Sequence, residues 1–148
     1  MEKEKEYNNN GELIFEGEYL NGERNGKGKE YDYGKLVFEG EYLNGERNRK
    51  GKEYNNYGKL VFEGEYLNGE RNGKGKKYNY YGNILFFEGE YLNGKRNGKG
   101  KEYNKYGKLF FVGEYKNGER WNGKRKEYNK NGELVFEGEY LNGKRKRI

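Results

Sequence analysis

Two patterns in the sequence have residue types that can carry chemistry. Carboxylates separated by one residue, such as Glu16 and Glu18, are the kind of pair that glycoside hydrolysis requires. Equivalent pairs recur throughout the chain beside lysines, and the sequence indicates no pocket around them. The run 22–27, Gly-Glu-Arg-Asn-Gly-Lys, has some features of a phosphate-binding loop. It has three residues between its glycines instead of four, and Gly28 stands where Ser or Thr would hold a metal. We therefore expect a turn here and no catalytic site.

The amino-acid alphabet excludes most other chemistry. The 148 residues contain no Ala, Cys, His, Pro, Gln, Ser or Thr. Without these residues the chain cannot form a Ser or Cys nucleophile with a His base, a zinc site of His and Cys, or a disulfide. We therefore predict a protein that is not an enzyme, with no catalytic, cofactor-binding or metal-binding residues and no cofactor.

Basic side chains are the remaining candidates for binding. The chain has 31 Lys and Arg against 25 Asp and Glu, a net charge of +6, and the excess lies in residues 86–148, whose net charge is +7. Such a cluster can attract acidic lipid headgroups with about 1 kcal/mol per Lys or Arg. The alternative is a solubilising tail that also protects an edge strand. The candidate residues for an anionic partner are Lys124, Arg125, Lys126, Lys144, Arg145, Lys146 and Arg147.

A repeat determines which elements position these residues. Phe-Glu-Gly-Glu-Tyr, or Phe-Val-Gly-Glu-Tyr in one copy, recurs every 23 to 25 residues. We call each interval a unit, and we predict one repeat domain over residues 1–148, with half units at 1–14 and 136–148. The five full units begin at Phe15, Phe38, Phe62, Phe87 and Phe111. The first ten residues are the longest stretch without glycine, which excludes helical bundles and membrane-spanning helices.

Each unit contains a β-prone segment that leads into an Asn-Gly pair. In the first unit, residues 13–20 alternate in character and are followed by Asn21-Gly22. Asn-Gly favours a type I′ turn, because both central residues of that turn have positive φ, so each unit predicts a β-hairpin. A two-residue loop pairs Tyr19 with Arg24, Gly17 with Gly26 and Phe15 with Gly28 on one face, and Glu16 with Lys27, Glu18 with Asn25 and Ile14 with Lys29 on the other.

Glycines opposite aromatic residues let the rings lie flat over the neighbouring strand. Because one hairpin is only marginally stable, the units must stack, which predicts an all-β, elongated, single-layer antiparallel meander of about 12 strands and roughly 55 Å. By alternation, one face carries the Phe and Tyr columns of the repeats and a leucine column, Leu13, Leu36, Leu60, Leu85, Leu109 and Leu134. Ile14, Leu20 and Tyr31 point to the other face. Three arrangements stay open for these residues: the ribbon curls and buries them, a β-bulge changes which face they occupy, or a partner covers them.

The pattern Phe15-x-Gly17-x-Tyr19-x-x-Gly22-x-x-x-Gly26-x-Gly28 resembles the MORN repeat, Tyr-x-Gly-x-Trp-x-x-Gly-x-x-x-Gly-x-Gly, in a form similar to its bacterial and protist variants. The resemblance covers nearly the whole chain and implies an extended ribbon of stacked hairpins. It also implies a scaffold, since members of the family act at membrane contacts and cytoskeletal structures or as modules attached to enzymes, and some bacterial variants carry an antitoxin label. Arg49, in the Gly26 column, and Arg125, in the Gly28 column, depart from the pattern.

Together these features predict a non-catalytic scaffold for protein–protein interaction or self-association through its aromatic and charged surfaces. The protein partner is unknown, and open edge strands would pair with a second copy. The alternatives are a peripheral adaptor for anionic membrane lipids and a regulatory, antitoxin-like protein. Acidic residues along every strand argue against nucleic acid. Residues 1–6 lack the apolar core of a secretory signal, so we expect a cytoplasmic location, at the membrane surface if lipid is bound.

Overall fold

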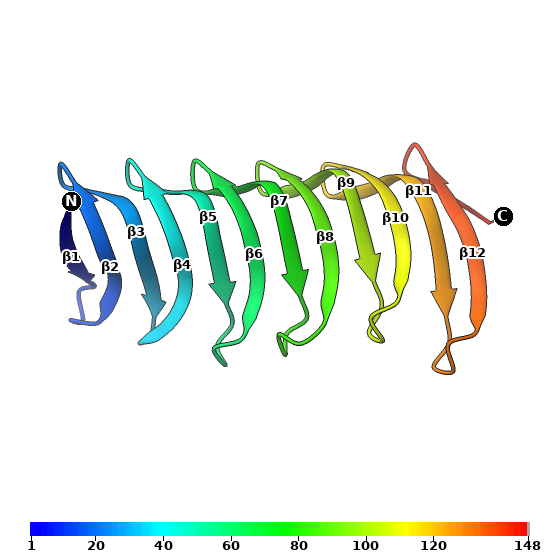
Figure 1. Ribbon diagram of the computed structural model, residues 1–148, viewed down its shortest axis with the longest axis horizontal. Coiled ribbons are helices and arrows are strands. Elements are labelled where there is room, and N and C mark those ends of the chain that lie inside the picture. Colours follow the sequence, from blue (N-terminus) through cyan, green and yellow to red (C-terminus); the bar gives the residue numbers. More distant parts are fainter. Residues whose placement is uncertain (148) are drawn as a thin grey trace.

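A computed structural model describes residues 1–147. They form one open antiparallel sheet of 13 strands, with strands ordered in space as in the chain and the two termini at opposite ends (Figure 1). The all-β ribbon expected from the repeat is confirmed, with 13 strands in place of about 12. The strands are β1 (Glu2–Tyr7), β2 (Leu13–Leu20), β3 (Glu23–Asp32), β4 (Lys35–Leu43), β5 (Glu46–Tyr54), β6 (Leu60–Leu67), β7 (Glu70–Tyr78), β8 (Leu85–Leu92), β9 (Lys95–Tyr103), β10 (Leu109–Lys116), β11 (Glu119–Tyr128), β12 (Leu134–Leu141) and β13 (Lys144–Arg147).

The Asn-Gly turns have the backbone that their residues predict. Asn21 has φ 52° and Gly22 has φ 78°, the left-handed values that a type I′ turn requires. The turns of successive hairpins are also bonded to one another along the upper edge of the ribbon in Figure 1. The Gly45 N–H donates to the Arg24 carbonyl at 2.9 Å, and the Gly69 N–H donates to the Arg47 carbonyl at 3.0 Å. This ladder joins neighbouring hairpins beyond the sheet itself.

The register of the hairpins from β2–β3 to β10–β11 differs from the prediction, whereas the β12–β13 hairpin keeps the predicted register. Tyr19 faces Arg24 as expected, but Gly17 faces Gly28, because the second strand bulges between these pairs. The residues at the bulge are held by Glu18, whose Oε1 accepts a hydrogen bond from the Lys27 N–H at 2.7 Å. The predicted pairs Gly17 with Gly26, Phe15 with Gly28, Glu16 with Lys27, Glu18 with Asn25 and Ile14 with Lys29 are therefore wrong, and Phe15 faces Glu30 and Glu16 faces Lys29. Since the shift is two residues, side chains keep their predicted faces.

A second bulge changes the predicted leucine column. Between β1 and β2, Glu6 pairs with Phe15 and Tyr7 pairs with Leu13, so Ile14 is left between them. The same shift recurs in the later units, where Leu36 faces Tyr31, and residues at the position of Ile14, such as Phe86, pack against the buried aromatic cluster. Placing Leu13, Leu36, Leu60, Leu85, Leu109 and Leu134 on the aromatic face was therefore wrong, because one bulged residue exchanges the two faces locally.

The core is a single layer of aromatic rings on one face, which we call the aromatic face. Five phenylalanines have no exposed surface, and the tyrosines between them are 4–7% exposed. The rings meet edge to face along the ribbon, as Phe38 and Tyr66 do with centroids 5.2 Å apart. Arginine guanidinium groups lie over the phenylalanines, Arg47 at 4.0 Å from the Phe38 centroid. The Phe and Tyr columns are thus a covered core and not the aromatic binding surface that the sequence suggested.

The predicted packing of aromatic rings over glycines is confirmed, although each ring covers a glycine diagonally across the strand pair and not the residue directly opposite. A Cβ built on Gly28 would lie 2.4 Å from the Phe15 ring, so only glycine fits below it. Arg49 does occupy the Gly26 column, with φ 67°. Arg125 occupies the Gly28 column toward β12, where it faces Gly138 as Gly28 faces Gly40, but within the fifth hairpin Gly123 faces Gly113 and supports the Phe111 ring. The bulge is one residue shorter there, because two residues, Trp121 and Asn122, lie between Arg120 and Gly123, where the first hairpin has three between Arg24 and Gly28.

Candidate binding surfaces

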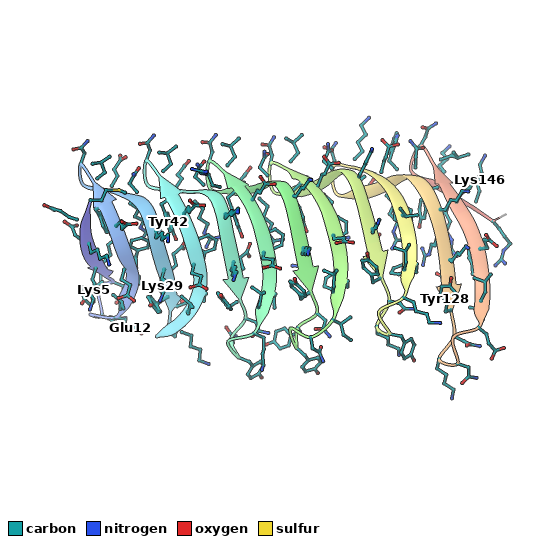
Figure 2. All side chains as sticks on the ribbon, viewed as in Figure 1. Lys5, Glu12, Lys29, Tyr42, Tyr128 and Lys146 are labelled. Atoms are coloured by element: carbon teal, nitrogen blue, oxygen red, sulfur yellow. The ribbon has the colours of Figure 1, made fainter. Side chains whose placement is uncertain are left out.

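A groove runs along the face opposite the aromatic rings, from β1 to β10, with a volume of about 2230 Å³. Glycine backbone from the centre of each strand from β2 to β10 contributes to its lining, together with columns of Glu and Lys from alternate strands. Lys29, for example, pairs with Glu16 on one side and with Glu39 on the other. Lys5 and Lys29 lie at corresponding levels of the ribbon in Figure 2. The groove face thus presents alternating rows of negative and positive charge, which we call the groove columns.

Tyrosines hold one column of groove carboxylates in place. The Tyr31 hydroxyl donates to Glu16 at 2.6 Å, and the Tyr103 hydroxyl donates to Glu88 at 2.5 Å. Burial, followed by the hydrogen bond to Glu16, raises the pKa of Tyr31 to about 12. These hydroxyls therefore stay protonated and keep the carboxylates oriented at neutral pH.

The acidic column is interrupted in the fifth unit. Val112 stands where the other units have glutamate, and it pairs with Lys101 and Lys124. The side chain of Val112 is 40% exposed. The groove columns therefore carry a local positive excess between β9 and β11.

Tyr–Glu–Arg clusters lie on the aromatic face, between successive hairpins. In one of them the Tyr42 hydroxyl donates to Glu30 at 2.5 Å, and Arg47 donates to both carboxylate oxygens, at 2.8 and 3.1 Å. Such bidentate, charge-assisted pairs are among the stronger hydrogen bonds in proteins. The clusters are Tyr19–Glu6–Arg24, Tyr42–Glu30–Arg47, Tyr66–Glu53–Arg71 and Tyr115–Glu102–Arg120.

These clusters keep their carboxylates ionised although they are partly buried. Burial alone would raise the pKa of Glu53, but the hydrogen bonds from Arg71 and Tyr66 more than offset it, so the pKa of Glu53 is lowered. The pKa of Arg71 is raised, because the hydrogen bond and charge of Glu53 outweigh the effect of burial. Each cluster is therefore a fixed ion pair that joins one hairpin to the next.

The structure divides the predicted basic residues between the two faces. Lys124 and Lys146 both pair with Glu139, and Lys126 pairs with Glu137, so these three extend the groove columns. Lys144 pairs with Leu141 and lies on the same face as Lys146, because residues two apart in a strand share a face. Arg125 donates to the Tyr140 hydroxyl at 3.0 Å on the aromatic face.

The remaining two basic residues also lie on the aromatic face. The guanidinium carbons of Arg145 and Arg147 lie 4.4 and 4.5 Å from the Phe136 ring centroid. All seven predicted residues are thus near the β11–β13 end, but they do not form one patch. In Figure 2, Lys146 lies at the C-terminal end of the ribbon.

The Tyr–Glu–Arg clusters were not found by the sequence analysis. Aligning the units would have shown glutamate at Glu6, Glu30, Glu53, Glu102 and Glu127, and lysine at the same position in β7, Lys77. The replacement of glutamate by Lys77 was the one sequence feature that pointed to these clusters. Which side chains this position contacts depends on the pairing of strands from successive hairpins, which the repeat pattern did not specify.

The described residues offer neither a metal cluster nor a membrane-spanning helix. Within residues 1–147, no group of three or more Asp and Glu side chains is placed to hold a metal ion. No helix in that range is long and apolar enough to cross a membrane.

Thirteen antiparallel strands in chain order, a glycine-backed row of aromatic rings and a Glu–Arg ion pair repeated at four of the contacts between successive hairpins define a single-layer β-repeat protein. The chain belongs to the MORN repeat family, whose model matches residues 15–34, 38–59, 62–79 and 87–105. MORN repeats generally form binding scaffolds for proteins or membranes and are not themselves catalytic. A comparison with curated proteins found no match.

Proposed function

We propose that this protein is a non-catalytic scaffold that binds a protein partner along the groove columns. The observation that supports this is the continuity of the groove over ten strands, with Glu and Lys alternating at the spacing of the hairpins. A partner with charges at a matching spacing would make the same contact several times. Linked contacts of this kind strengthen binding through their effective concentration.

The test is affinity capture from the cells that make the protein, with partners identified by mass spectrometry. The informative variant is Lys52→Gln/Lys76→Gln/Lys101→Gln, which neutralises three exposed side chains that line the groove and spares the aromatic core. The matched control is Lys35→Gln/Lys59→Gln/Lys105→Gln, which removes the same charge from exposed residues at the strand ends and turns. We expect the groove variant to lose its partner and the control to retain it. Equal capture by both variants would contradict the proposal.

A peripheral membrane adaptor is a second candidate, favoured by the basic residues around β11 and β13. Lys124, Lys126 and Lys146 lie on the groove face, close to the interruption of the acidic column at Val112. Anionic vesicles should bind the wild type and release it as salt is raised. Neutral residues in place of Lys124, Lys126 and Lys146 should abolish binding, and binding that persists in this variant would exclude these side chains as the contact.

Self-association is a third candidate, favoured by the exposed part of β12. Over residues 1–147, β13 pairs with Gly138–Leu141 only, and Leu134 and Val135 are 49% and 58% exposed. Since Glu6 corresponds to Glu30, the end of β1 of a second copy, from Lys5 to Tyr7, would continue this edge beyond β13, with Glu6 beside Phe136 as Glu30 lies beside Phe15. Such head-to-tail contacts do not close and would produce species larger than dimers. A monomeric mass by light scattering over a wide concentration range would refute this candidate.

A further inference from the structure

The Tyr–Glu–Arg cluster between β7 and β9 has a cation at the position of its carboxylate. Lys77 pairs with Phe62 and Phe87, which is the register that Glu53 has with Phe38 and Phe62. Lys77 therefore occupies the same place in the sheet as the glutamates of the other clusters. Its side chain is neither fully buried nor fully exposed.

The other two members of the cluster keep their positions. The Arg96 guanidinium carbon lies 4.0 Å from the Phe87 centroid, and Arg71 lies 3.9 Å from that of Phe62. The Tyr91 ring meets the Phe62 ring edge to face at 5.3 Å, and Tyr91 is 5% exposed. The arginine fork and the tyrosine that bind a carboxylate elsewhere are thus preserved.

Tyr91 Oη is buried and has no hydrogen-bond partner within residues 1–147. In the next cluster the hydroxyl of Tyr115 donates to Glu102. Burial raises the pKa of Tyr91, while the charges of Arg71 and Arg96, and the approach of the Arg96 guanidinium to the hydroxyl as a donor, oppose the rise. Its proton therefore remains available to an acceptor, and an unpaired buried hydroxyl is costly to the fold.

The surrounding charges leave the cluster positive. Glu53 is paired with Arg71, and Glu102 is paired with Arg120 at 2.6 Å. The carboxylate nearest to Arg96 is that same Glu102, at 4.0 Å. Burial lowers the pKa of Lys77, and the charges of Arg71 and Arg96 lower it further, whereas Glu53 opposes them. Lys77 and Arg96 thus lack a dedicated counter-ion among the described residues.

We propose that Lys77, Tyr91 and Arg96 form a binding site for a phosphate group. The arginine fork and the tyrosine hydroxyl bind two oxygens, as they do for a carboxylate in the other units, and the Lys77 ammonium binds a third. A dianion offsets both unpaired cations, whereas a carboxylate has neither the third oxygen nor the second charge. Because the lysine stem is long and flexible, its ammonium moves aside to admit the ligand and then closes over it.

This site lies on the aromatic face, so it is separate from the groove columns on which the proposed function depends. Phosphate reaches it either as the free ion or as a monoester on a larger molecule. Both sources present the same terminal oxygens to the three side chains. The experiment therefore needs one probe for each source.

The test measures the thermal unfolding midpoint of the full chain in inorganic phosphate, glycerol 3-phosphate, acetate and chloride at constant ionic strength. We expect a saturable rise with the two phosphate probes over the chloride baseline, because a ligand that binds only the folded state stabilises it. A rise with inorganic phosphate alone would identify the free ion, and a larger rise with glycerol 3-phosphate would identify an ester. An equal rise with acetate would overturn the assignment to phosphate.

Lys77→Glu supplies the carboxylate of the other units, so it should fold with a higher midpoint and lose the phosphate-dependent rise. Lys105→Glu, which makes the same charge change in an exposed turn, should retain the rise in full. Glu30→Lys should raise the calorimetric stoichiometry of phosphate binding from one site to two by creating the same arrangement with Tyr42 and Arg47. A phosphate response that is unchanged in Lys77→Glu would refute the site, whatever the behaviour of the other variants.

Discussion

The hydroxyls of Tyr66 and Tyr91 occupy equivalent places in successive units but have different partners. Tyr66 donates to Glu53, whereas Tyr91 Oη is buried without a partner among residues 1–147. Replacing each tyrosine by phenylalanine removes one oxygen and leaves the ring in the core. The two rings are almost equally buried, at 4% and 5% exposure, so the difference between Tyr66→Phe and Tyr91→Phe isolates the hydrogen bond.

The magnitudes follow from the partners. A hydrogen bond to a charged group contributes about 1.5–3 kcal/mol, so Tyr66→Phe should lower the free energy of unfolding by about 2 kcal/mol. Tyr91→Phe removes a buried hydroxyl that has no partner, so it should leave the free energy of unfolding unchanged or raise it by about 1 kcal/mol. The second variant therefore tests whether the lysine at position 77 has left its neighbour unsatisfied.

Urea denaturation followed by circular dichroism provides the measurement, and the fluorescence of Trp121, the only tryptophan, provides a second probe. Coincident transitions from the two probes would establish that the array unfolds as one cooperative unit and that the two variants can be compared. Measurements in buffer without phosphate keep Tyr91 free of a ligand. Equal losses of stability in the two variants would refute the difference between the clusters.

Other predictions concern the same clusters and the glycine layer. Lys77→Glu should raise the free energy of unfolding by about 2 kcal/mol in denaturation experiments, because it restores a charge-assisted hydrogen-bond partner. Gly51→Ala should lower it by about 1–3 kcal/mol, since its Cβ would lie 2.4 Å from the Phe38 ring. Stability should fall in acid titrations as pH drops below the ordinary glutamate value of 4.5, because the folded-state pKa is lowered at Glu6, Glu30, Glu53 and Glu102. It should be retained up to pH 10 and decline towards pH 12 in alkaline titrations, because the folded-state pKa is raised to about 12 at Tyr31, Tyr78 and Tyr103.

The hairpins were predictable because their signals are local. Asn21 and Gly22 accept left-handed φ values wherever they occur, and the alternation of residues 15–20, beyond the bulge at Ile14, fixes which side chains share a face. The repeat then requires neighbouring hairpins to pack in the same way. The role of glycine beneath the rings was also predictable, because only a residue without a side chain fits under a phenylalanine such as Phe15.

The register and the clusters could not be predicted in the same way. The bulge after Arg24 depends on the Glu18 carboxylate, which holds the Lys27 N–H from the opposite strand. The predicted site residues 124–126 and 144–147 are two runs made only of Lys and Arg. Because successive residues of a strand point to opposite faces, their side chains lie on both faces of the sheet. Composition alone carries no information about this separation.

The sequence by itself determined the hairpin repeat, the turns and the aromatic layer, because each depends on backbone preferences and packing within one unit. Only the tertiary structure decided the pairing between units, and with it which glutamate meets which tyrosine and arginine. That pairing also places Lys77, which replaces the glutamate of the other units, beside Tyr91 and Arg96, which come from a different hairpin. Contacts between hairpins depend on the bulges that set strand register, and those bulges are stabilised by side chains from opposite strands.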